Sequence, residues 1–222
     1  MLDICVQTIV RNEEDYLYPC IAVVAPHVKR IRIGFDTRST DGTVDVLKRL
    51  LREFPHVEVL PFKVEDPFTD LVVARNKLLG FPEKWGFIVD SDEFHQDIAS
   101  YTLQNDSGYA FQSWAVWNDK EAHKASCKAI IGRIFKNSPE LHWKGRFNNE
   151  VLYNDKKPVF SDPVLLPYKY IHFTHVKKDN WRKELKKERI ADGRCLIDLP
   201  DSIKTAVRDI HKEMSIVPTW RV

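Results

Sequence analysis

The regular alternation of short β-branched runs with longer amphipathic segments constrains the fold of this chain more than any other feature. Residues 4–10 (ICVQTIV), 31–35 (IRIGF), 57–62 (VEVLPF) and 87–89 (FIV) have the composition of buried strands. Helical patterns follow the first three, over residues 11–28, 43–54 and 69–79. Parallel strands need such crossover helices. We therefore predict an α/β fold with a mostly parallel sheet flanked by helices.

The expected helix boundaries follow from capping and stop signals. We expect the first helix to begin through Asn12, and the third to stop at Gly80 and Pro82. Residues 39–43 (STDGT) supply turn and cap chemistry before the second helix. That helix is predicted to present one apolar face, made of Val44, Leu47, Leu50, Leu51 and Phe54.

The second half of the chain has a different residue pattern. Residues 109–117, 130–135, 150–153 and 168–173 are short β-like runs, several with aromatic residues, and they predict mixed or antiparallel strands. Residues 178–190 and 202–214 are helical by composition. With 222 residues, 43% of them hydrophobic, the chain can bury one large core. We expect a single domain over residues 1–222, with a Rossmann-like half (1–100), a mixed-strand half (101–176) and a C-terminal helical segment (177–222).

Composition narrows the classes of partner. A formal charge of +2 on a chain with 30% charged residues indicates no nucleic-acid footprint. No apolar run approaches the roughly 18 residues of a membrane span, so we expect a soluble, cytoplasmic protein. The four cysteines form no Cys-x-x-Cys pair, and we expect buried thiols rather than disulfides or a zinc site: Cys5, Cys20, Cys127 and Cys195.

Three carboxylates follow the fourth predicted strand, in the stretch WGFIVDSDEF (residues 85–94). Residues two apart on a strand point the same way, so Asp90 and Asp92 could present oxygens toward one point. Buried together they would repel, and a hard divalent cation such as Mg²⁺ or Mn²⁺ would cancel that repulsion. A solvated turn with a capping role is the alternative. Polar stretches also follow the first strand (VRNEE) and the second (FDTRSTDGT).

Four stretches in this order resemble the family 2 glycosyltransferases, whose nucleotide-binding domain has the GT-A fold: QTIVRNEEDYLYPCI from Gln7, FDTRSTDGT from Phe35, ARNKLL from Ala74 and WGFIVDSDEF from Trp85. The resemblance implies a metal-dependent, inverting, hexosyltransferase-like enzyme of GT-A-like fold that uses Mn²⁺ or Mg²⁺. It implies a UDP- or GDP-sugar as donor and a hydroxyl acceptor, which could be a glycan, a lipid-linked sugar or a protein. The mixed-strand half would bind the acceptor.

The resemblance assigns the first two strand ends to the donor nucleotide. Asp36 matches the aspartate that hydrogen-bonds the base, and the backbone near Thr8 and Val10 would flank that base. Arg11 and Glu13 lie in the matching first loop, where Glu13 would contact the nucleotide or its ribose. A turn or helix-cap aspartate is the alternative for Asp36.

The same resemblance places Arg75 beside the nucleotide and makes Asp92 the direct metal ligand. Asp90 would contact the ribose or bind the metal through water. One departure is visible: many relatives read Asp-Asp-Gly-Ser where this chain reads DTRS (residues 36–39). Arg38 replaces a small flexible residue there, and we expect it to alter the turn or touch the donor.

The second half offers a candidate general base. KGRFNNEVL (residues 144–152) resembles a Gly-x-x-His-Glu segment of small relatives, with Asn149 in the histidine position and Glu150 retained. Glu150 could take the proton of the acceptor hydroxyl. A structural carboxylate paired with Arg146 or Lys144 is the alternative.

Late histidines and tryptophans carry weaker hypotheses. His172 and His175 could supply a third metal ligand, for which we favour His175, although either could be a core or surface histidine. Core packing is favoured over stacking on a sugar for Trp114, Trp117 and Trp143. The basic tail around Trp181 is typical of a solvated helix face, and a peripheral membrane contact is the minority interpretation.

Two other functions stay open. A metal-dependent nucleotidyltransferase predicts a glycine-rich phosphate loop or a catalytic lysine near the first strand, whereas neither Gly-x-Gly-x-x-Gly nor a P-loop is present. A noncatalytic nucleotide-sugar or carbohydrate-binding module would keep Asp36 and tolerate loss of Asp92 or Glu150.

Overall fold

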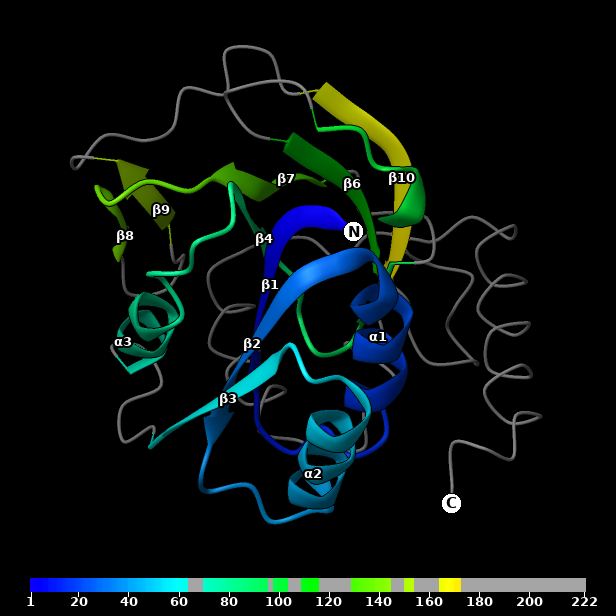
Figure 1. Ribbon diagram of the computed structural model, residues 1–222, viewed down its shortest axis with the longest axis vertical. Helices are drawn as coiled ribbons and strands as arrows, with labels where there is room; N and C mark the ends of the chain where they lie inside the picture. Colours follow the sequence, from blue (N-terminus) through cyan, green and yellow to red (C-terminus); the bar gives the residue numbers. More distant parts are fainter. Residues whose placement is uncertain are drawn as a thin grey trace, which may run out of the picture.

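The computed structural model describes residues 1–63, 70–95, 98–103, 109–115, 129–144, 150–153 and 164–172 (Figure 1). Its strands are β1 (Leu2–Val10), β2 (Val28–Asp36), β3 (Val57–Phe62), β4 (Trp85–Ile88), β5 (Glu93–Phe94), β6 (Tyr109–Ala115), β7 (Ala129–Lys136), β8 (Leu141–Lys144), β9 (Glu150–Tyr153) and β10 (Val164–His172). Its helices are α1 (Leu17–Val24), α2 (Thr43–Glu53) and α3 (Asp70–Lys77), with 3₁₀ turns at Ala25–His27 and Ile98–Ser100. The predicted helices at 178–190 and 202–214 lie outside the described residues.

The sheet confirms the predicted parallel half. Eight strands pair in the order β3-β2-β1-β4-β7-β6-β10-β5. β1 lies between β2 and β4 and is parallel to both, and β2 is parallel to β3. The carboxyl ends of these four strands therefore share one edge of the sheet, which is where open α/β sheets bind their ligands.

The second half of the chain extends the same sheet. β7 runs antiparallel to β4, β6 antiparallel to β7, β10 parallel to β6, and β5 antiparallel to β10. The mixed pairing predicted for this half is confirmed. Two strands were not predicted, β5 because it has only two residues, and β8, which pairs with β9 in a separate two-stranded sheet.

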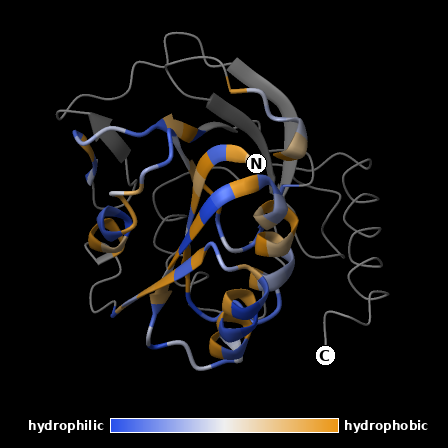
Figure 2. Ribbon diagram, in the orientation of Figure 1, coloured by the Kyte–Doolittle hydropathy of each residue, from blue (hydrophilic) through white to orange (hydrophobic). Residues whose placement is uncertain are grey.

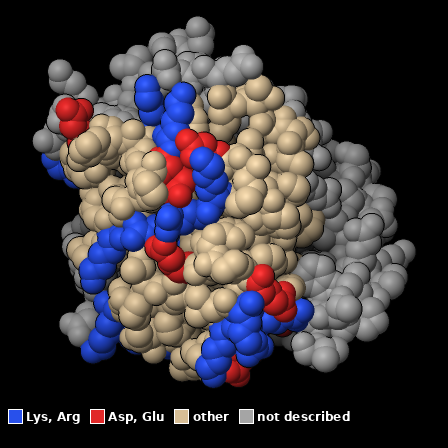
Figure 3. Space-filling model, viewed as in Figure 1, with Lys and Arg blue, Asp and Glu red and all other residues tan. Residues whose placement is uncertain are grey.

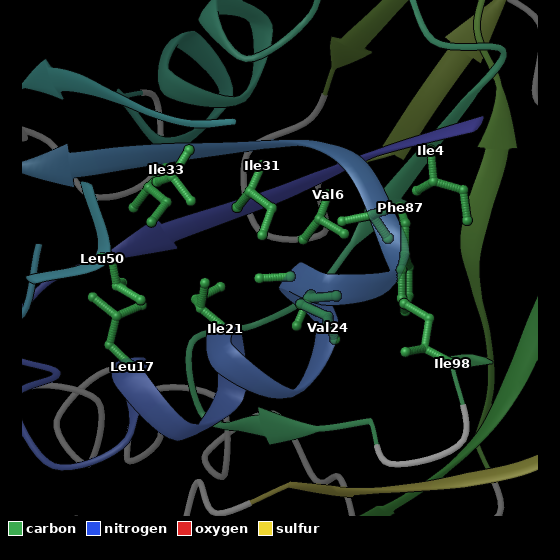
Figure 4. Packing of buried hydrophobic residues seen from close by; sticks show 14 of the residues in the cluster. Ile4, Val6, Leu17, Ile21, Val24, Ile31, Ile33, Leu50, Phe87 and Ile98 are labelled. Carbon is green, nitrogen blue, oxygen red and sulfur yellow. The ribbon is translucent and has the colours of Figure 1, made fainter. Parts of the chain in front are cut away.

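Helices cover both faces of the parallel half (Figure 1). α1 and α2 pack on one face, where alternate residues of β1 and β2 meet Ile21 and Leu50 (Figure 4). Trp85 and Phe87 of β4 belong to the same cluster. On the other face α3 contributes Ala74, which packs with Phe62. The core therefore holds β1 and β4 rigidly up to the edge where their polar residues begin.

The predicted apolar face of α2 is partly wrong. Leu47 and Leu50 are buried and Phe54 packs against the core, but Val44 and Leu51 are 39% and 45% exposed. Figure 2 shows hydrophobic and hydrophilic residues side by side on α2.

Two cysteines match the expectation of buried thiols. Cys5 and Cys20 are buried and free, and burial raises the pKa of the Cys5 thiol far above its ordinary value. Cys127 and Cys195 lie outside the described residues. Among the helices that the structure describes, none has the length and apolar character to span a membrane.

Gly86 gives a test of the packing between β4 and β7. A Cβ at this position would lie 2.9 Å from Cζ of Phe81 and closer still to ring atoms of Phe135, whereas at Gly34 the nearest atom would be Cε1 of Phe62 at 3.2 Å. We predict that Gly86→Ala lowers the free energy of unfolding by about 1–3 kcal/mol, the usual cost of overpacking a core. Urea denaturation would measure it. Gly34→Ala is the control, and an equal loss in both variants would contradict the packing seen here.

Candidate functional site

Two loops at the carboxyl edge, after β1 and after β2, are joined through Asn12. Its backbone N–H donates to Oγ of Ser39 at 3.3 Å, and its side-chain Oδ1 accepts from the N–H of Thr40 at 2.8 Å. Asn12 has a positive φ of 54°, a conformation that asparagine tolerates better than most residues. The predicted helix start at Asn12 is wrong for this reason, and α1 begins at Leu17.

The same two loops are joined again at the start of α2. The N–H of Glu13 donates to Oγ1 of Thr43 at 2.7 Å, and that of Glu14 donates to Oδ2 of Asp41 at 3.1 Å. In return the N–H of Gly42 donates to Oε2 of Glu14 at 2.7 Å. Asp41 also accepts from the N–H of Thr43 at 3.1 Å, which forms the predicted turn, but the N-cap residue of α2 is Gly42 and makes no side-chain cap. These bonds make the two loops one rigid rim.

Asp36, the last residue of β2, lies within this rim and is only 1% exposed. Both of its oxygens accept hydrogen bonds from the Arg38 side chain, at 3.2 and 3.0 Å, and the Arg38 N–H adds a third at 3.1 Å. Arg11 lies 3.8 Å away. Burial alone would raise the pKa of Asp36, but the hydrogen bonds and charges of Arg38 and Arg11 outweigh it and hold this pKa below its ordinary value. Arg38 therefore occupies the Asp36 carboxylate from within the same turn.

Three more residues assigned to the nucleotide lie on β1 or in the loop after it. Thr8 and Val10 are buried opposite Ile33 and Phe35 of β2. Glu13 is buried too, and its carbonyl accepts from the N–H of Leu17 at the start of α1. The structure thus brings the predicted residues of the first and second strand ends together.

A tight turn follows β4 and carries the Asp-x-Asp stretch. The Glu93 N–H donates to the Asp90 carbonyl at 2.9 Å, and the Asp90 N–H donates to Oε2 of Glu93 at 3.0 Å. The strand geometry from which we expected Asp90 and Asp92 to point the same way does not apply here, because β4 ends with Ile88. The Asp90 side chain is 27% exposed, whereas Asp92 is fully buried.

Arginines share the neutralisation of these carboxylates, whereas the prediction was neutralisation by a cation alone. Arg133 of β7 contacts Oδ2 of Asp90 at 3.3 Å and also pairs with Glu93. Arg75 of α3 lies 3.8 Å from Oδ1 of Asp90. Sequence reasoning missed Arg133, although a single arginine inside the apolar run AIIGRIF was a signal, because a charge buried in a strand needs a partner.

His95 packs behind the same turn. It is buried 3.5 Å from Oε2 of Glu93, with its ring centroid 4.9 Å from that of Phe87. Burial holds the pKa of His95 below its ordinary value, although Glu93 acts in the opposite direction. A neutral His95 thus supports Glu93 without adding a charge.

The charge of Asp92 acts on Tyr16, the residue before α1. Burial and the charge of Asp15, followed by the charges of Asp92 and Glu13, raise the pKa of Tyr16 to about 12. Tyr16 directly precedes α1, so the carboxylates of the first loop and of the Asp-x-Asp turn act on the same phenol. The first and fourth strand ends are therefore electrostatic neighbours.

The donor types at this edge suit a hard divalent cation, but the described side chains do not complete a site. Within the described ranges, no three His, Cys, Asp or Glu side chains gather closely enough to hold a metal ion. Magnesium sites often use one or two protein carboxylates and fill the remaining positions with water and phosphate oxygens. Asp92 fits such a role better than Asp90, which two arginines engage. The buried hydroxyls of Thr8 and Ser91 also have no hydrogen-bond partner among the described residues.

Two predicted residues come from later in the chain. Glu150 begins β9, and its Cα is paired with that of Lys144 on β8. Lys144 is one of the two basic residues named in the alternative, in which Glu150 is a structural carboxylate. His172 ends β10 opposite Glu93. The late strand therefore ends beside the Asp-x-Asp turn, while His175 lies outside the described residues.

Trp143 is a core residue, as the favoured interpretation predicted. It is buried on β8, with its ring centroid 6.3 Å from that of Phe135. Trp117 lies outside the described residues, and Trp114 belongs to β6.

Outside the carboxyl edge, the charged side chains are also balanced by neighbours of opposite sign. On the face shown in Figure 3, basic and acidic side chains adjoin one another instead of forming a field of one sign. The ion pairs on the strands have the same character, since Arg30 pairs with both Glu58 and Glu83, and Lys29 contacts Asp3 at 2.8 Å. These pairs hold neighbouring strands together.

Comparison with known proteins finds partial structural likenesses. No family model matches the chain, and no curated protein matches it. Among solved structures, residues 1-349 of S. aureus TarS are 15% identical with a TM-score of 0.42 over 61% of this chain and 47% of that fragment. The mannosyltransferase PcManGT from Pyrobaculum calidifontis, solved with GDP-Man and Mn²⁺, is 15% identical with a TM-score of 0.42 over 60% of this chain and 44% of its own.

A third likeness is to glucosyl-3-phosphoglycerate synthase from Mycobacterium tuberculosis, at 15% identity and a TM-score of 0.39, over 54% of this chain and 46% of that one. The chain spans less than half the length of each of these three proteins. Likenesses this partial carry no inference about activity.

The Asp36 ion pairs predict a pH-dependent stability. Because the folded-state pKa of Asp36 is lowered, its contribution is complete above the ordinary aspartate value of about 3.9 and is lost as the pH falls through the folded value. We expect Asp36→Asn to be less stable than wild type at neutral pH, with a gap that shrinks on acidification below about pH 4. Denaturant unfolding at neutral pH and below about pH 4 would measure this gap in stability, with the exposed Asp15→Asn as control. A gap that widens in acid would contradict the assignment.

Proposed function

We propose that this chain is a glycosyltransferase of the GT-A type that moves a sugar from a nucleotide-diphosphate sugar to a hydroxyl acceptor. One observation carries the proposal: the polar residues after β1, β2 and β4 converge on one edge of a parallel sheet. Arg11 contacts Asp36 there, and Glu13 and Asp92 act on the same tyrosine. Crevices at such edges bind nucleotides in open α/β sheets.

In this proposal the nucleotide lies over the first two strand ends. The base would lie near Asp36, flanked by the backbone at Thr8 and Val10, and would have to exchange with Arg38 for the carboxylate oxygens. Arg11 and Arg75 would offset diphosphate charge, since arginine suits phosphate recognition. A polar ligand would also satisfy the buried hydroxyls of Thr8 and Ser91.

A divalent cation, Mn²⁺ or Mg²⁺, would bind Asp92 directly and Asp90 through water. His175 is the proposed third ligand, supported by the position of His172, the end of β10, opposite Glu93. When bound, such an ion stabilises negative charge on a departing diphosphate. The chain's own part is to hold Asp92 buried and oriented, through the Asp90–Glu93 turn and its arginines.

The acceptor hydroxyl would lose its proton to Glu150 as the new bond forms, with inversion at the anomeric carbon. We further propose membership of family 2, transfer of a hexose, a cytoplasmic location and a UDP- or GDP-sugar donor. The acceptor would be a glycan, a lipid-linked sugar or a protein, and the basic C-terminal segment would give a peripheral membrane contact.

A noncatalytic nucleotide-sugar-binding module is the second candidate. Two observations favour it: Arg38 occupies both oxygens of Asp36, and Lys144 lies opposite Glu150. Such a module would bind the donor through Arg11 and Arg75 without transfer. The two predictions below separate these functions.

Donor binding is predicted to depend on the metal. We expect one of UDP-, GDP- or dTDP-sugars to raise the melting temperature only with Mn²⁺ present, because Asp92 would hold the ion and the ion would offset the charge of the diphosphate. Asp92→Ala and the isosteric Asp92→Asn should lose this shift. Asp45→Ala, an exposed aspartate on α2, is the control and should keep it. The same shift without any cation would remove the metal from the proposal.

Loss of the general base is predicted to spare binding. We expect Glu150→Gln to bind the donor normally and to transfer sugar at least about a hundredfold more slowly, the usual scale for general-base catalysis. Donor affinity and product formation would be measured on the same preparation. Glu140→Gln, in the exposed turn before β8, is the matched control. Unchanged transfer in Glu150→Gln would assign the base elsewhere, and no transfer by wild type would favour the binding module.

A further inference from the structure

Asn76 of α3 holds the edge of β8 in the way a neighbouring strand would. Its Nδ2 donates to the carbonyl of Trp143 at 3.1 Å, and its Oδ1 accepts from the N–H of Trp143 at 2.8 Å. Both backbone groups of Trp143 are therefore taken by α3. In an antiparallel ladder the two groups of one residue point the same way, so those of Trp143 point away from Val151, its partner on β9.

The preceding residue connects the same strand to the Asp-x-Asp turn. The guanidinium carbon of Arg75 lies 4.9 Å from the ring centroid of Trp143, and its NH2 lies 3.8 Å from Oδ1 of Asp90. Adjacent residues of α3 thus touch β8 on one side and the turn after β4 on the other. The helix is a physical bridge between these two parts of the edge.

The β8–β9 pair needs such a bridge. It forms a two-stranded sheet separate from the eight-stranded one, so strand pairing does not fix its orientation to β4. Isolated two-stranded hairpins are marginally stable in water. The buried ring of Trp143 anchors the β8–β9 pair through apolar contacts. Because apolar contacts are not directional, they fix how deeply the pair is buried more than how it is oriented. The two hydrogen bonds of Asn76 are directional and hold a single residue of β8.

We propose that Asn76 is a positioning residue that sets the orientation of the β8–β9 pair, and with it Glu150, toward the turn of Asp90 and Asp92. Glu150 is paired with Lys144, directly beside Trp143. The inference rests on the proposed function, in which Glu150 accepts the acceptor proton. A shift of about 1 Å in a reacting group can lower a rate about a hundredfold.

The decisive experiment compares Asn76→Ala with a matched asparagine. Asn137 also uses its amide on backbone groups, donating to the carbonyls of Phe81 at 2.7 Å and Glu83 at 3.0 Å, but it lies beside the start of β4, at the opposite end from Asp90. For Asn76→Ala we expect kcat to fall about a hundredfold, with the donor Kd changed by less than about twofold. Asn137→Ala should lose comparable stability and keep kcat within about twofold. Equal effects on kcat, or none from Asn76→Ala, would overturn the proposal.

Hydrogen exchange gives a readout that does not depend on activity. Amides of residues 141–144 and 150–153 should exchange faster in Asn76→Ala and at the wild-type rate in Asn137→Ala. If wild type binds no sugar nucleotide, the proposed function fails, and the exchange rates alone decide the role of Asn76. Unchanged exchange in Asn76→Ala would overturn it.

A second, milder variant keeps the proposal testable if Asn76→Ala does not fold. Asn76→Asp keeps an oxygen that accepts from the Trp143 N–H and removes the donor to the Trp143 carbonyl. We expect it to fold and to lose roughly tenfold in kcat with the donor Kd retained, since one of the two directional bonds remains. A wild-type kcat in this variant would also overturn the proposal.

Discussion

Charge compensation by arginine is the interaction on which the carboxyl edge of this sheet depends. Asp36, Asp92 and Glu93 are buried almost completely, and the free-energy cost of burying ionised carboxylates is met only when close partners are present. Arg38 and Arg133 supply such partners for Asp36 and Glu93. Arg38 comes from the β2–α2 loop, whereas Arg133 comes from β7, so the turn after β4 depends on the second half of the chain for this partner.

The compensated edge is also mechanically continuous. The loops after β1 and β2 are joined by side-chain to backbone hydrogen bonds from Asn12 through Thr43, and the turn after β4 closes on itself between Asp90 and Glu93. α3 then joins this turn to β8 through Arg75 and Asn76. Sites on rigid elements hold their groups more precisely than sites on loops. The arrangement suits a ligand that spans several strand ends, as a nucleotide-diphosphate sugar would.

Much of the fold could be predicted because strand and helix periods differ strongly in the first hundred residues. The parallel pairing of β1, β2, β3 and β4 follows from strands separated by crossover helices, whereas their order in the sheet was seen only in the structure. The start of α1 could not be predicted, because Asn12 adopts a left-handed conformation that its hydrogen bonds to the β2–α2 loop support. The exposure of Leu51 was missed because a pattern shows which residues are apolar and not how the helix is rotated on the sheet.

For the candidate site, the residue types and their placement at strand ends were determined by the sequence alone: carboxylates and arginines directly after three apolar strands. The tertiary structure decided which of them are paired. Arg133 meets Glu93 across forty positions of chain, and Asn76 meets Trp143 across a longer separation. Local patterning encodes where the chain turns and which residues it buries, whereas ion pairs and directional hydrogen bonds between distant segments depend on how the packed layers bring those segments together.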